Sequence, residues 1–323
     1  MEQKAEFGTF RNYTDSKFQD RVERTYREMQ TNQTLGFVEK NKDKYFKLAH
    51  GNMDIYEVFK LLEQVIDESD PDSDLPQIIH AYQSAESVYD FGMHDETELR
   101  DDLLIRPLFK DDAWNNLPEK WRKLYEEKKT IKALYSHITD WSWFPLVAFI
   151  HDLGKVMLLP SFGKLPQWAV VGDTYPVAAP FAKANVFFDK KFYQESADFP
   201  KYETITDTAF GNYPKHCGFD NVHMTWGHDE YVYEVARQGT DICYEGLYLL
   251  RYHSFYPWHT PQNGVMAYTE LASDKDWQLL PLLKAFQKAD LYSKSPSLPP
   301  LDILEAKYRK LMDKYIPKKK IAW

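Results

Sequence analysis

The stretch FIHDLGKV, residues 149–156, decides how this chain is interpreted. It sets an imidazole beside a carboxylate, His151 and Asp152, within residues 144–158, whose apolar pattern predicts a helix. Burying either group without a partner would be costly. Neighbouring residues on a helix point about 100° apart. The pair can still serve one site if the carboxylate bridges two metal ions and the histidine binds one of them, so it is a natural seed for a dinuclear centre.

Other imidazoles and carboxylates lie on apolar stripes far away in the sequence. His228 falls in line with Met224 and Tyr231, and Asp290 falls in line with Phe286. The candidate metal ligands are therefore His80, His151, Asp152, His228, His253 and Asp290. Such a nitrogen and oxygen set suits iron, manganese or zinc rather than a thiolate site. A lone histidine on an apolar face is more often a core residue, so spacing alone leaves both readings open.

Two lysines follow two of these candidates by one helical turn. Lys155 comes four residues after His151, and Lys294 comes four residues after Asp290, so each shares a face with its candidate ligand. An ordinary structural reading pairs the lysines with carboxylates. The functional reading has them hold substrate oxygens, with the acidic run DESDPDSD (67–74) accepting hydrogen bonds from hydroxyls. Basic and acidic side chains facing each other across a pocket suit a neutral polyol.

Composition excludes several classes of protein. The chain has 323 residues and a formal net charge of −9, which argues against a nucleic-acid surface. Two cysteines are too few for a disulfide framework and fit a reducing compartment. The first ten residues carry no apolar signal region, and the longest apolar stretch is too short to span a bilayer. We expect a cytoplasmic protein that binds neither nucleic acid nor membranes.

Helical patterns dominate the chain, and strand alternation is rare. We expect one all-α domain over residues 1–323. A helix should begin at Pro281, and short strands are plausible only around 169–171 and 187–188.

Several long segments, in one order along the chain, resemble myo-inositol oxygenase. They are FRNYTDS (10–16), VIDESDPDSDLPQIIHAYQSAE (65–86), HDLGKV (151–156), PQWAVVGDTYPV (166–177), HCGFDNVHMTWGHDEY (216–231), RYHSFYPWH (251–259) and ADLYSKSPSLP (289–299). HDLGK alone would be weak evidence, because HD-type phosphodiesterases carry a similar motif. The whole set is specific and runs from about residue 10 to Trp323.

The resemblance implies a compact all-helical HD-type domain that holds two irons, mixed-valent Fe(II)/Fe(III) in the active form. It implies one iron on His80, His151, Asp152 and Asp290, and a second on Asp152, His228 and His253. It gives catalytic roles to Lys155 and Asp152. The implied substrate contacts are Arg11, Asp67, Asp70, Lys155, Gly172, Asp173, His253, Ser254 and Lys294. The implied reaction opens the ring of myo-inositol with dioxygen to give D-glucuronate.

One region departs from the family pattern. His80 and His151 are 71 residues apart, which is longer than the family's usual link, so residues from about 91 to 137 are interpreted as an insertion. Its many charges favour a surface excursion over a lid. A monomer is favoured. Two other functions stay open, namely a two-metal HD-type phosphohydrolase and a metal-stabilised scaffold without catalysis.

Overall fold

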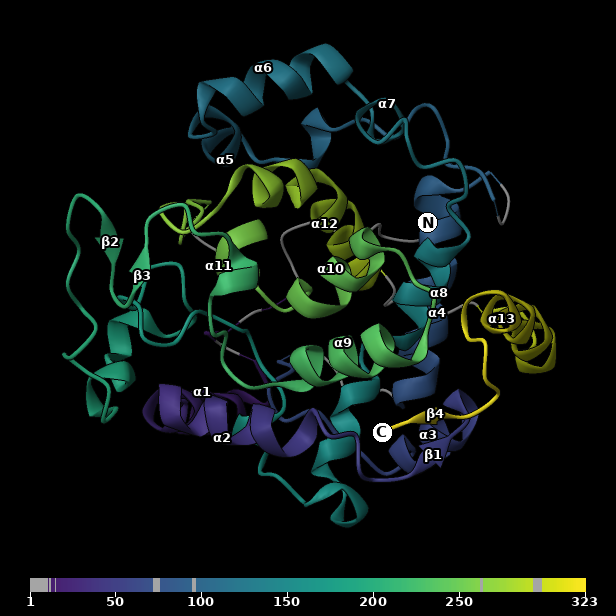
Figure 1. Cartoon of the computed structure of the whole chain (residues 1–323), viewed down its shortest axis with the longest axis horizontal. Helices are drawn as coiled ribbons and strands as arrows, with labels where there is room; N and C mark the ends of the chain where they lie inside the picture. Colours follow the sequence, from purple (N-terminus) through teal and green to yellow (C-terminus); the bar gives the residue numbers. More distant parts are fainter. Residues whose placement is uncertain are drawn as a thin grey trace.

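The computed structural model describes residues 11, 13–14, 16–71, 76–94, 97–261, 264–292 and 298–323. Helices make up most of it, which confirms the all-α prediction (Figure 1). The α-helices are α1 (Gln19–Asn32), α2 (Leu35–Tyr45), α3 (Ile55–Leu62), α4 (Gln77–Gly92), α5 (Asp111–Asn115), α6 (Glu119–Lys128), α7 (Ile131–Leu134), α8 (Trp143–Ile150), α9 (His228–Gly239), α10 (Tyr244–Tyr252), α11 (Tyr256–His259), α12 (Asp274–Tyr292) and α13 (Leu301–Tyr315). None of the described helices combines the length and the apolar character that crossing a bilayer requires.

The short strands lie elsewhere than expected. β1 (Asn52–Met53) pairs antiparallel with β4 (Ile321–Ala322), and β2 (Ala209–Phe210) pairs with β3 (Tyr213–Pro214). The strands expected at 169–171 and 187–188 are wrong, because 3₁₀ turns occupy 167–169 and 188–190. Local bonds satisfy the backbone there: the Val170 amide donates to the Gln167 carbonyl at 2.9 Å.

Helix α8 forms the centre of the fold. All eight of its residues are buried, which explains why its sequence, WFPLVAFI, is apolar on every side. It packs against α4, α10 and α13, while α12 lies against α4 and α9 lies against α10. The segments that carry the candidate ligands therefore meet around one core.

The helix expected over 144–158 is wrong in its second half. The α-helix ends at Ile150, and a 3₁₀ helix, η2 (Leu153–Leu158), follows. Gly154 allows α9 to approach this turn closely, because a Cβ there would stand 1.9 Å from the His228 carbonyl oxygen. Side chains three residues apart line up in a 3₁₀ helix, so Asp152 and Lys155 share a face.

Helix α12 runs through Pro281, so the expected helix start at that residue is wrong. A proline lacks the amide hydrogen that would bond the carbonyl four residues earlier. The hydroxyl of Tyr125 donates to that carbonyl, on Trp277, and the hydroxyl of Tyr135 donates to the carbonyl of Gln278. With these replacement bonds the helix continues to the segment that carries Asp290.

Both tyrosines belong to segment 97–137, which contains α5, α6 and α7 and lies over α12 (Figure 1). Trp114, Trp121 and Tyr125 are buried in it, while most of its charged residues are exposed. The segment is thus packed onto the helix that it supports.

Candidate metal centre

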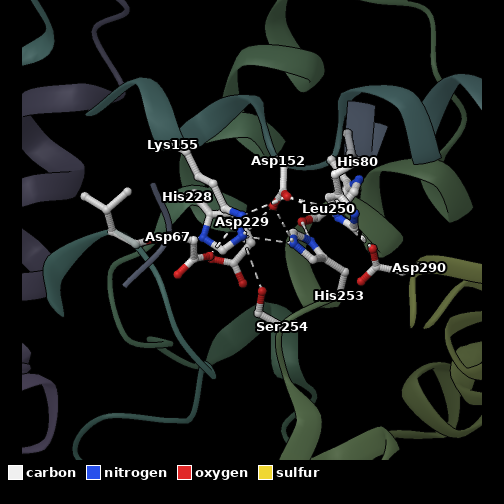
Figure 2. Close-up of polar contacts among 12 residues, drawn as sticks. Asp67, His80, Asp152, Lys155, His228, Asp229, Leu250, His253, Ser254 and Asp290 are labelled. Carbon is white, nitrogen blue, oxygen red and sulfur yellow. Dashed lines mark hydrogen bonds and ion pairs between the residues drawn. The ribbon is translucent and has the colours of Figure 1, made fainter. Parts of the chain in front are cut away.

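The six candidate ligands meet at one cavity of about 110 Å³. His80 comes from α4, His228 begins α9, and Asp290 lies near the end of α12. The break after α8 supplies His151 and Asp152, and the residue after α10 is His253. Figure 2 shows Asp152 between His228 on one side and His80 and Asp290 on the other. Residues spread over more than 200 positions therefore converge.

The two carboxylate oxygens of Asp152 face two different groups. Oδ2 lies 3.5 Å from both His80 Nε2 and His151 Nε2, and Asp290 Oδ1 lies 3.1 Å and 3.3 Å from the same two nitrogens. We call the side chains of His80, His151 and Asp290, together with Asp152 Oδ2, the His80 half-site. Its acidic members raise the pKa of His151 to about 9 although burial opposes this. The half-site therefore attracts positive charge.

The other oxygen, Asp152 Oδ1, lies 3.2 Å from His228 Nε2 and 3.9 Å from His253 Nε2. The two Nε2 atoms are themselves 3.0 Å apart. We call the side chains of His228 and His253, together with Asp152 Oδ1, the His228 half-site. Burial, followed by the neighbouring histidines, holds the pKa of His253 well below its usual value, which favours the neutral imidazole.

Backbone carbonyls fix which ring nitrogens face the cavity. His228 Nδ1 lies 2.7 Å from the Val170 oxygen, and His253 Nδ1 lies 2.9 Å from the Leu250 oxygen. A carbonyl only accepts, so each Nδ1 carries a hydrogen and each ring turns its Nε2 towards the cavity. In the His228 half-site two Nε2 atoms and Asp152 Oδ1 therefore face one place. Imidazole nitrogens and a carboxylate oxygen that face one place can together hold a metal ion.

The geometry suits metal ions. Two ligands about 2.1 Å from an ion and at right angles to each other are about 3.0 Å apart, close to the separations seen here. His151 shows the same outer bond, from Nδ1 to the Ala148 oxygen at 2.8 Å. Such bonds typically orient histidine ligands of metals. The residues fit two ions, one in each half-site, with Asp152 between them.

Lys155 connects the candidate centre to the acidic run. Its Nζ lies 2.8 Å from Asp152 Oδ2 and 3.0 Å from Asp67 Oδ2. Burial would raise the pKa of both carboxyls, but the ammonium group lowers the pKa of Asp67 and helps to hold that of Asp152 well below its usual range. Lys155 therefore forms the salt bridge of the structural interpretation. Because this ion pair lines the cavity, Lys155 can also contact a substrate oxygen there, as the functional interpretation requires.

A second polar group also lines the cavity. Arg11 Nη2 lies 2.6 Å from both Asp173 oxygens, and its guanidinium stacks on the Tyr256 ring at 3.4 Å. The Tyr26 hydroxyl donates to Asp173 Oδ1 at 2.8 Å. Ser254 Oγ lies 3.4 Å from His228 Nε2. These donors and acceptors surround a space that can take a hydroxyl-rich molecule.

The sequence-predicted contact residues are placed as follows. Those that line the cavity are Arg11, Asp67, Asp70, Lys155, Gly172, Asp173, His253 and Ser254. Lys294 lies outside the described residues. The prediction missed Tyr26 and Tyr256, which also line the cavity. Tyr26 occupies an apolar helical stripe, a pattern typical of core residues, so spacing gave no signal for it.

Comparisons with known proteins match this chain to one family over most of its length. A family model described as myo-inositol oxygenase matches residues 19–108 and 118–323, which include most of the residues interpreted as an insertion, so the bounds of that insertion stay a prediction. A probable inositol oxygenase of Oryza sativa subsp. japonica is 39% identical over 318 residues, covering 97% of this chain and 85% of the relative. The inositol oxygenase of Mus musculus is 38% identical over 312 residues, covering 96% and 89%. Inositol oxygenase 5 of Arabidopsis thaliana is 41% identical over 313 residues, covering 95% and 82%.

Proposed function

The chain belongs to the myo-inositol oxygenase family, and from this premise we propose that it is an oxidoreductase that opens the ring of myo-inositol with dioxygen. The product is D-glucuronate. One oxygen atom enters the product and the other leaves in water, while the substrate supplies all four electrons. The observation that carries the proposal is the convergence of His228 Nε2, His253 Nε2 and Asp152 Oδ1 beside the His80 half-site, at a cavity lined by polar side chains.

We propose that the metal is iron and that two ions bind, in a mixed-valent Fe(II)/Fe(III) state when active. The His80 half-site would hold one ion and the His228 half-site the other, with Asp152 shared. When bound, the pair supplies the activation of dioxygen and lowers the pKa of a hydroxyl that it binds. The donor set supports this choice, since imidazole and carboxylate suit iron and no described cysteine lines the cavity.

The residues of the chain bind and orient the substrate. Lys155 uses two of its three N–H groups on Asp152 and Asp67, so its third is available to a substrate oxygen. Asp67 and Asp173 accept hydrogen bonds from ring hydroxyls, and Arg11 and Ser254 donate. Fixing a rigid polyol at several hydroxyls sets which carbon faces the metal side of the cavity.

The phosphohydrolase alternative is not favoured. Asp67, Asp70 and Asp173 line the same cavity and would repel a phosphate. A scaffold without catalysis leaves the polar lining of the cavity without a purpose. A cytoplasmic monomer with residues 1–323 as one domain stays a prediction.

The test is oxygen uptake by iron-loaded protein on addition of myo-inositol, with the product identified. We expect uptake of one dioxygen for each D-glucuronate formed, and no phosphate release from nucleotides. His228→Ala serves as the site control, because it removes a predicted ligand and should abolish uptake. A flat oxygen trace with iron bound would overturn the proposal.

A further inference from the structure

The elbow between α10 and α11 carries much of the site. His253 directly follows α10, Ser254 comes next, and Tyr256 begins α11. All three line the cavity. The last carbonyls of a helix have no partner within the helix, so the His253 carbonyl needs a donor from elsewhere.

His259 supplies that donor from below the elbow. It is fully buried (0% exposed), and its Nε2 lies 3.0 Å from the His253 carbonyl oxygen. Because the carbonyl only accepts, Nε2 must carry the hydrogen. This nitrogen therefore points at the backbone of a predicted metal ligand and not into the cavity, and His259 is not among the residues that line the cavity.

Contacts with α12 hold His259 in place. The Lys284 Nζ donates to the His259 carbonyl oxygen at 2.6 Å. Thr260 Oγ1 lies 3.0 Å from His259 Nδ1 and 3.2 Å from Gln287 Oε1. The Nε2 hydrogen and the backbone oxygen of His259 are thus engaged, and the Thr260 hydroxyl lies beside Nδ1, so the ring cannot tilt without breaking a buried hydrogen bond.

We propose that His259 is a positioning residue for the His228 half-site, acting through the backbone of His253. The inference rests on the proposed metal function and adds to it the side chain that sets the direction of the His253 imidazole. The Leu250 carbonyl holds ring Nδ1 of His253, and His259 holds the backbone carbonyl of His253. Both the ring and the backbone of this residue are therefore fixed. Partners beyond the ligands typically contribute 10- to 100-fold to metal affinity.

The experiment is metal titration of the metal-free protein with Fe²⁺ under anaerobic conditions, reading bound metal rather than turnover. His259→Leu removes the donor at similar size, and His259→Gln keeps an N–H at a comparable distance. We expect His259→Leu to lower the affinity for one of the two ions by roughly 10- to 100-fold and to leave the affinity for the other unchanged. His259→Gln should restore most of the lost affinity, because its amide can donate to the same carbonyl.

Reference variants identify the affected half-site. The His259→Leu titration should resemble that of His228→Ala and differ from that of His80→Ala. Two ions bound with wild-type affinities by His259→Leu would overturn the inference. If wild-type protein itself binds fewer than two ions, the proposed dinuclear function fails instead.

A milder variant keeps the inference testable if His259→Leu does not fold. Thr260→Val removes the partner of His259 Nδ1 but leaves the ring in place. It should weaken the same half-site by a smaller factor, and an unchanged titration would count against the proposal.

Discussion

Replacing Lys155 by Met should affect the metal-free protein more than the metal-loaded one. The ammonium group lies between two carboxylates, and the exposed fractions of the Lys155, Asp152 and Asp67 side chains are 8%, 7% and 16%. Removing one partner of a buried ion pair typically costs about 3–5 kcal/mol. We expect that loss in the metal-free protein, since Asp152 and Asp67 are then both left without their cation.

Metal binding should reduce the loss for a simple electrostatic reason. Ions in the two half-sites would compensate the charge of Asp152. Only the Asp67 carboxylate is then left without its Lys155 partner, which should cost about 1–3 kcal/mol of the unfolding free energy. The assay is urea unfolding of wild-type protein and Lys155→Met, each with chelator and with saturating Fe²⁺. Metal content should stay at the wild-type level while oxygen uptake collapses.

Lys42→Met is the matched control. Lys42 Nζ lies 2.8 Å from Glu230 Oε1, in a buried ion pair that does not line the cavity. Its loss should destabilise the protein equally with and without metal. The reasoning on Lys155 is refuted if its variant loses the same free energy in both states, or if it retains wild-type turnover.

Three further predictions concern stability. Burial lowers the pKa of Lys284 from the ordinary 10.5 to about 7, so the unfolded chain binds more protons between these values and this residue makes the protein more stable as pH rises. The unfolding free energies of wild type and Lys284→Met, measured in urea at pH 7, 8 and 9, should diverge by up to about 1.4 kcal/mol per pH unit, and parallel curves would contradict the assignment. Tyr125→Phe leaves the Trp277 carbonyl without its donor and should cost about 1–3 kcal/mol in urea unfolding, with metal content unchanged. Gly154→Ala forces a Cβ onto the His228 carbonyl and should cost roughly 3 kcal/mol or more; a wild-type denaturation midpoint would disprove the close approach.

The sequence predicted the helical class because apolar residues recur at helical spacing, and four of its six candidate donors lie in segments with that spacing. The structure brings these donors together, although their role as iron ligands stays a prediction. Spacing could not reveal the break after Ile150, because the turn that follows it packs closely, at Gly154, against the distant residue His228. The adjacent pair His151 and Asp152 reaches both half-sites through that break.

Residues that act through the backbone escaped the prediction for a related reason. His259 is not among the candidate ligands, and its contact with the His253 carbonyl depends on a tight elbow that no spacing rule describes. Tyr256 likewise reaches Arg11 only once α11 is placed. Such roles come from the path of the chain and not from residue type.

The proline within α12 makes the helix and segment 97–137 dependent on each other. A chain shortened by that segment would leave the Trp277 carbonyl without its donor, unless Pro281 were exchanged for a residue whose amide hydrogen can bond that carbonyl. Engineering a smaller version of this protein should therefore begin by substituting Pro281, and only then remove the segment.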